Sequence, residues 1–157
     1  MKKVLIALDF GPSAQVIAET GYNLAKSMNA EVYLLHVTAD ATYYSALNYS
    51  PIMGFDSFSN LDIVQSDAVV ELRQAAQDYL DKSRLHLNDD RIQTIIKDGD
   101  FGESILDTAT EIGADVIVMG SHSRRGLEKI LMGSVAEKVL HRSKIPMFII
   151  PTRTEEE

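Results

Sequence analysis

Five short, nearly continuous apolar runs constrain the fold of this 157-residue chain more than any other feature. Valine, isoleucine, leucine and methionine dominate the runs and seldom alternate with polar residues. Such runs are typical of strands buried on both faces, which occur in parallel sheets covered by helices on either side. The predicted strands are Val4–Leu8, Val32–Val37, Ile92–Ile96, Val116–Met119 and Met147–Ile150.

Longer amphipathic segments with helix-capping residues separate these runs. Helices are predicted from about Ser13 to Met28, with Ser13 as the cap, and from about Asp62 to Leu87. A third is predicted from Asp100-x-x-Glu103, a variant of the capping box, to Gly113, and a fourth opens at Ser134 and ends before Pro146. The order βαβαβαβαβ predicts an α/β fold with right-handed crossovers, a doubly wound parallel sheet of strand order 3-2-1-4-5.

The chain length suits a single domain, which we place at residues 1–152, followed by an acidic C-terminal tail at 153–157. The segment Thr38–Asn60 has no clear period, and a loop of this length is usually functional or disordered. Its tyrosines and phenylalanines argue against plain disorder and favour a packed lid over a substrate cage.

Composition excludes several classes of protein. The net charge of −8 argues against a nucleic-acid-binding surface, and the absence of cysteine rules out disulfides and thiolate zinc sites. No apolar run approaches the ~20 residues of a membrane span, and the run after the N-terminus is too short for a signal peptide. No spacing of His, Asp and Glu indicates a zinc or iron site. We therefore expect a cytoplasmic protein.

Small residues flank a strand end and a helix start in the pattern of a phosphate-binding site. Gly120 follows the fourth apolar run, and Ser123 lies three positions further on. After nine intervening residues, Gly133-Ser134 opens a helix. This layout lets backbone N–H groups approach an anion closely. It is neither a Walker A loop nor a dinucleotide fingerprint, because neither glycine motif occurs in the chain.

The predicted sheet brings other groups to the same place. Ligands of doubly wound sheets bind beyond the strand carboxyl ends, where the strand order reverses. The tips concerned are Asp9, Val37 and Gly120, together with the helix start at Ser134. One carboxylate, strand-end backbone and a helix N-terminus suit a nucleotide, with the carboxylate on the ribose and N–H groups on the phosphates.

The region from Gly120 to Ile145 is basic within an acidic protein. Six basic residues stand against Glu128 and Glu137, and they form either a solvated helix face or a positive collar for a polyphosphate. They are Arg124, Arg125, Lys129, Lys138, Arg142 and Lys144.

Four segments together make the chain resemble the universal stress protein family over essentially its whole length. They are the opening Val-Leu-Ile-Ala-Leu-Asp, Leu34–Val37, Gly113–Gly120 and Gly133–Val139. The resemblance implies a Rossmann-like fold, similar to the adenine nucleotide alpha hydrolases, and a homodimer formed through Met147–Ile150. The family's ATP-binding branch carries Gly, two residues, Gly, nine residues, then Gly-Ser or Gly-Thr. This chain matches at Gly120 and Gly133-Ser134 but has Ser123 in place of the second glycine.

The resemblance also implies the nucleotide contacts. Asp9 would hold the ribose, Val37 would contact adenine through its backbone, and Gly133, Ser134 and Val135 would bind phosphates that carry Mg²⁺ or Mn²⁺. The implied ATP site comprises Ala7, Leu8, Asp9, Val37, Met119, Gly120, His122, Ser123, Arg124, Gly133, Ser134 and Val135. Serine at position 123 weakens the match, because it costs on the order of 1 kcal/mol if that position needs a positive φ.

Several of these residues have simpler interpretations. Asp9 could cap the first helix or sit in a turn, and Ser134 could be an N-cap. His122 suits a loop or ligand edge rather than catalysis, because no orienting acid or oxyanion hole is indicated. We expect His36 in the core or at a strand end. His86 and His141 are expected on helix surfaces.

Three functions remain open from the sequence. The first is an ATP-binding regulatory homodimer of the stress response that is not an enzyme, with slow ATP hydrolysis at most. The second is a dimeric interaction module of the same fold without nucleotide, which Ser123 favours. The third is an enzyme on a related scaffold, which the lack of a catalytic constellation disfavours.

Overall fold

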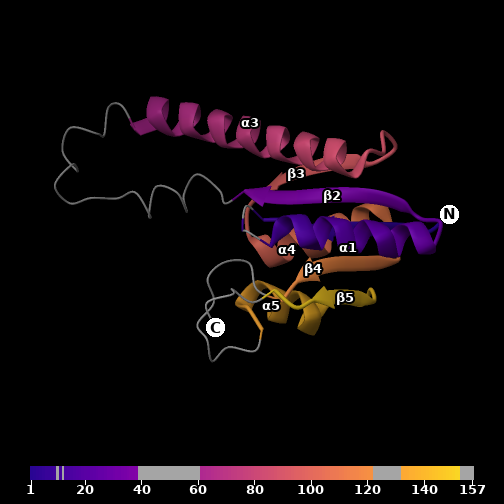
Figure 1. Ribbon diagram of the computed structural model, residues 1–157. Coiled ribbons are helices and arrows are strands. Elements are labelled where there is room, and N and C mark those ends of the chain that lie inside the picture. The colour runs from indigo at the N-terminus through magenta and orange to yellow at the C-terminus, as the bar shows by residue number, and fades with distance from the viewer. Residues whose placement is uncertain (10, 12, 39–60, 122–131, 153–157) are drawn as a thin grey trace.

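A computed structural model describes residues 1–9, 11, 13–38, 61–121 and 132–152, with the backbone alone described for 61–69. Five parallel strands form one sheet in the order β3-β2-β1-β4-β5, as predicted (Figure 1). The elements in chain order are β1 Lys3–Ala7, α1 Ala14–Ser27, β2 Glu31–Thr38, α3 Leu61–Leu87, β3 Gln93–Asp98, α4 Phe101–Ile112, β4 Val116–Gly120, α5 Ser134–Arg142 and β5 Met147–Ile150.

Two hydrophobic cores lie on opposite faces of the sheet. Val4, Ile6 and Leu8 pack with α1 and α3 on one face, whereas Leu5 packs with α4 and α5 on the other. The central strands β1, β2 and β4 therefore bury side chains on both faces, which explains their continuous apolar sequence. This arrangement is the doubly wound sheet that the sequence predicts.

The edge strand β3 departs from the predicted pattern. Its residues from Thr94 to Lys97 are only partly buried, and Ile92 lies just before the strand with 2% of its surface exposed. An edge strand has a neighbour on one side only, so its side chains are less covered than those of a central strand.

The predicted side-chain cap forms at α4, but no side-chain cap forms at α1 or α5. Asp100 has an extended backbone and its side chain accepts a hydrogen bond from the Glu103 N–H, while Gly113 ends α4 in the left-handed conformation at φ 68°. Ser13 already has helical backbone angles, φ −87° and ψ −2°, and makes no side-chain cap bond. A capping side chain needs a non-helical backbone. Ser13 therefore stands at the predicted N-cap position, but its side chain does not cap α1. In α5 the N-cap is Gly133, and Ser134 is the first helical residue rather than the cap.

Some predicted features fall outside the described residues. The expected loop Thr38–Asn60 is described only at Thr38, which ends β2, and the acidic tail 153–157 is not described. Within the described part of the chain, no helix combines the length and apolar character needed to cross a membrane.

Candidate functional site

The winding of the sheet reverses between β1 and β4. From β1 the chain winds outward through β2 to β3, and it then returns to β4 on the other side of β1 before reaching β5. The carboxyl ends of β1 and β4, at Ala7 and Gly120, therefore lie at the topological switch point. Ligands of this class of fold bind beyond the strand ends at that point.

Asp9 lies in a hydrogen-bonded turn directly after β1. Its Oδ1 accepts a 2.8 Å hydrogen bond from the Gly11 N–H, and its backbone carbonyl accepts one of 2.7 Å from the Tyr79 hydroxyl. The turn interpretation of Asp9 is confirmed. The cap interpretation is wrong, because the residue before α1 is Ser13. Asp9 is partly exposed at the switch point.

His36 is buried in β2 and faces the end of β1. Its Nδ1 lies 2.9 Å from the carbonyl oxygen of Leu8, and only 5% of its surface is exposed. Burial lowers the pKa of His36, so the ring is neutral near pH 7. The expected core position is confirmed, and His86 and His141 are exposed on α3 and α5 as predicted.

Tyr79 is a site residue that the sequence did not single out. It lies on α3 between Ala76 and Leu80, which are fully buried, so the helical period alone places it near the sheet. Its partner Asp9 is 70 residues away in sequence, and no local pattern encodes that contact. Burial raises the pKa of Tyr79 to about 12, so its hydroxyl keeps its proton.

Packing alone favours glycine at position 120, whether or not a ligand binds there. A Cβ atom at this position would lie 2.7 Å from Cδ1 of Ile17 and 3.0 Å from Oγ1 of Thr152. Helix α1 and the segment after β5 therefore approach the end of β4 so closely that any side chain at position 120 would have to displace Ile17 or Thr152.

Ser121 connects the end of β4 to β5 and α5. Its N–H donates to the carbonyl of Ile150, its Oγ accepts from the Thr152 N–H, and its carbonyl accepts a 2.6 Å bond from the Gly133 N–H. The start of α5 is thus held against the end of β4. Because the Gly133 N–H is engaged in this bond, the first donors of α5 that lack a carbonyl within the helix are those of Ser134, Val135 and Ala136.

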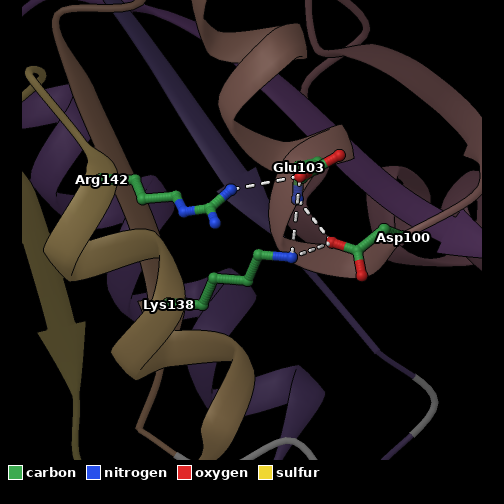
Figure 2. Close-up of polar contacts among 4 residues, drawn as sticks. All are labelled: Asp100, Glu103, Lys138 and Arg142. Carbon is green, nitrogen blue, oxygen red and sulfur yellow. Dashed lines mark hydrogen bonds and ion pairs between the residues drawn. The ribbon is translucent and has the colours of Figure 1, made fainter.

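Two basic residues of the predicted collar, Lys138 and Arg142, form ion pairs with carboxylates at the start of α4, as Figure 2 shows. Lys138 Nζ lies 2.8 Å from Asp100 Oδ2, and Arg142 Nη1 lies 3.1 Å from Glu103 Oε1. The Lys138 ammonium is the largest cause of the lowered pKa of Asp100. These two residues join α5 to α4 through the carboxylates of Asp100 and Glu103, and a collar around a polyphosphate stays a prediction. Arg124, Arg125 and Lys129 lie outside the described residues.

Most of the predicted site residues thus lie together at the carboxyl ends of the central strands and at the start of α5. The strand-end residues are Ala7, Leu8, Asp9, Val37, Met119 and Gly120, and the helix-start residues are Gly133, Ser134 and Val135. His122, Ser123 and Arg124 lie outside the described residues. Among the residues that the structure describes, no group of three or more His, Asp or Glu side chains could hold a metal ion.

Known proteins are similar to this chain in sequence and in fold. The sequence profile of the Universal stress protein family matches residues 1–151. Universal stress protein MJ0577 of Methanocaldococcus jannaschii is 29% identical over 153 residues, which cover 95% of this chain and 94% of that protein. The solved structure of MJ0577 superimposes with a TM-score of 0.77 at 25% identity and 98% coverage of both chains.

A universal stress protein solved in complex with cAMP also shares the fold. Its TM-score is 0.61 at 19% identity, with 96% of each chain covered. The family match spans almost the entire chain and agrees with the strand order and with the motifs at the switch point. This chain therefore belongs to the universal stress protein family.

Proposed function

We propose that this protein binds ATP at the switch point and acts as a regulatory protein of the stress response. One observation carries the proposal: the bond from the Gly133 N–H to the Ser121 carbonyl holds the N-terminus of α5 beside the end of β4, next to the strand that leads to Asp9. A helix N-terminus attracts phosphate through its N–H groups and its dipole.

The described residues fit the parts of a nucleotide. Ser134 and Val135 would donate N–H groups to phosphates, and the Asp9 carboxylate would accept from ribose hydroxyls. β1 ends at Ala7, whose register partner is Leu35, so Val37 on β2 lies beyond the end of β1. The backbone of Val37 would contact the adenine there. Mg²⁺ or Mn²⁺ would neutralise the phosphates. The family member that was solved with cAMP supports an adenine nucleotide as the ligand class.

The nucleotide acts in this proposal as a ligand that changes the protein rather than as a substrate. His36 is buried and bonded to the Leu8 carbonyl, so it is a structural group rather than a general base. Hydrolysis would be slow at most. The protein would work in the cytoplasm as a homodimer through β5, whose Phe148 is 39% exposed at the sheet edge.

The second candidate is a dimeric interaction module of the same fold that binds no nucleotide. The residue that favours it is Ser123, where the ATP-binding branch has glycine. We propose that Ser123 tunes affinity: a change of no more than about tenfold between wild type and Ser123→Gly is expected, since one strained residue and one added hydrogen bond are of similar size.

Native purification followed by denaturation and mass spectrometry of the released small molecules separates these functions. ATP or ADP in the released fraction supports the proposal. A nucleotide-free protein that also fails to bind added Mg-ATP supports the interaction module. An unrelated metabolite would reopen an enzymatic function.

A further inference from the structure

Two side chains from different elements hold consecutive carbonyl groups directly after β1. His36 of β2 contacts the carbonyl of Leu8 at 2.9 Å, and the Tyr79 hydroxyl of α3 donates to the carbonyl of Asp9 at 2.7 Å. Both carbonyls lie past the last residue of β1, where regular strand pairing ends. The path of the chain into the Asp9 turn is therefore set by side chains and not by the sheet alone.

The two rings also contact each other. The centroids of His36 and Tyr79 are 6.0 Å apart with an interplanar angle of 72°, an edge-to-face arrangement. Displacement of one ring would disturb the other, so the two residues act on the turn as a unit.

The two groups that donate to these carbonyls, the His36 ring and the Tyr79 hydroxyl, keep their protons near neutral pH. A carbonyl oxygen only accepts hydrogen bonds, so the neutral His36 ring carries its proton on Nδ1. Burial raises the pKa of Tyr79 to about 12, which keeps the hydroxyl a donor. The support of the turn is therefore constant across the neutral pH range.

We infer that Tyr79 and His36 are positioning residues that aim the Asp9 carboxylate, and that they thereby let the site select nucleotides with ribose hydroxyls. The inference rests on the ATP-binding function proposed above. Asp9 Oδ1 accepts from Gly11 within the same turn, so the carboxylate moves with the backbone that the two side chains hold. The phosphate donors belong to α5, whereas the bonds of His36 and Tyr79 described above go to carbonyls at the end of β1. Loss of the support should therefore weaken the ribose contact more than the phosphate contacts.

The test compares the dissociation constants of Mg-ATP and Mg-2′,3′-dideoxyATP for three proteins. They are the wild type, Tyr79→Phe, which deletes the hydroxyl, and Tyr22→Phe as the matched control. The Tyr22 hydroxyl also donates to an aspartate, Asp89, but on the loop that precedes β3. A second readout is hydrogen exchange of the Gly11 amide, which is bonded to Asp9.

We expect the wild type to prefer ATP by about tenfold or more, the value of a hydrogen bond to a charged group. In Tyr79→Phe the preference should fall by about threefold or more and the Gly11 amide should exchange faster. Tyr22→Phe should change neither. Equal binding of both nucleotides by the wild type, or a preference that Tyr79→Phe leaves unchanged, overturns this inference while ATP binding stands. A wild type that binds neither nucleotide contradicts the proposed function, and this inference with it.

Discussion

Lys138 of α5 forms a 2.8 Å ion pair with Asp100, the N-cap residue of α4. The same carboxylate oxygen accepts the capping bond from the Glu103 N–H at 2.9 Å. Gly102 lies beneath the Lys138 stem, and a Cβ there would be 2.9 Å from Cδ of Lys138. One aspartate therefore both starts α4 and holds it to the helix that carries the proposed phosphate donors.

The two roles of Asp100 can be separated by substitution. Asp100→Ala removes the cap and the ion pair and should cost about 1–2 kcal/mol of unfolding free energy. Asp100→Asn keeps a capping oxygen and loses only the charge on a side chain that is 53% exposed, so it should cost about 0.5 kcal/mol or less. Denaturant unfolding of both variants measures the difference. Equal losses would show that the ion pair, and not the cap, provides the stability.

The packing role of Gly120 predicts a specific rescue. Gly120→Ala places a methyl group 2.7 Å from Cδ1 of Ile17 and should cost about 1–3 kcal/mol through overpacking. Ile17→Val removes that Cδ1 atom, so the double variant should be more stable than the sum of the two single losses predicts. Unfolding free energies of the four proteins complete the cycle. Additive losses would contradict the contact.

His36 predicts a pH dependence of stability. Its pKa is lower in the folded protein than its usual value of 6.5, because burial disfavours the charged ring. Between those two values the unfolded chain binds more protons than the folded one, so stability rises with pH in that window. Stability should therefore decline as the pH falls below about 6.5, and the decline should be smaller in His36→Asn. Thermal unfolding at closely spaced pH values measures both slopes, and parallel curves would contradict the assignment to His36.

If the protein dimerises through β5, a charged residue on the exposed face of that strand should disrupt the dimer. Light scattering should give twice the 17.4 kDa chain mass for the wild type. Phe148→Asp should yield the monomer, because the charge would be buried between two paired edge strands. Leu85→Asp is the control, since Leu85 is exposed on α3, away from this edge. A monomeric wild type, or a dimer that survives Phe148→Asp, would exclude this interface.

The features of this fold that depend on residues close together in the chain could be predicted from the sequence. The apolar runs predict the sheet, and Asp100 and Gly113 predict both ends of α4, because burial and capping act over a few residues. Ser13 shows the limit of this reasoning. Its residue type suits a cap, but the preceding turn, with Ala14 N–H bonded to the Gly11 carbonyl, gives it a helical backbone.

The contacts that position the site residues join segments far apart in the sequence, so they could not be predicted from local sequence patterns. Gly120 suggested an anion site, yet the side chains of Ile17 and Thr152 also leave little room for a Cβ atom there. The basic residues Lys138 and Arg142 suggested a collar, but their partners lie 38 and 39 residues away on α4. The sequence shows that these residues are basic, but their carboxylate partners are known only from the folded structure.

Isothermal titration calorimetry with Mg-ATP tests the central claim most directly. We expect saturable binding of one nucleotide per chain, abolished in Gly133→Val. Gly133 has φ −68° and ψ 157°, a conformation open to valine, so this variant should fold while its branched side chain crowds the phosphates. Circular dichroism and thermal unfolding verify that fold. A wild-type protein that gives no binding heat and no thermal shift with millimolar Mg-ATP would contradict the account, as would a folded Gly133→Val variant that binds as tightly as the wild type.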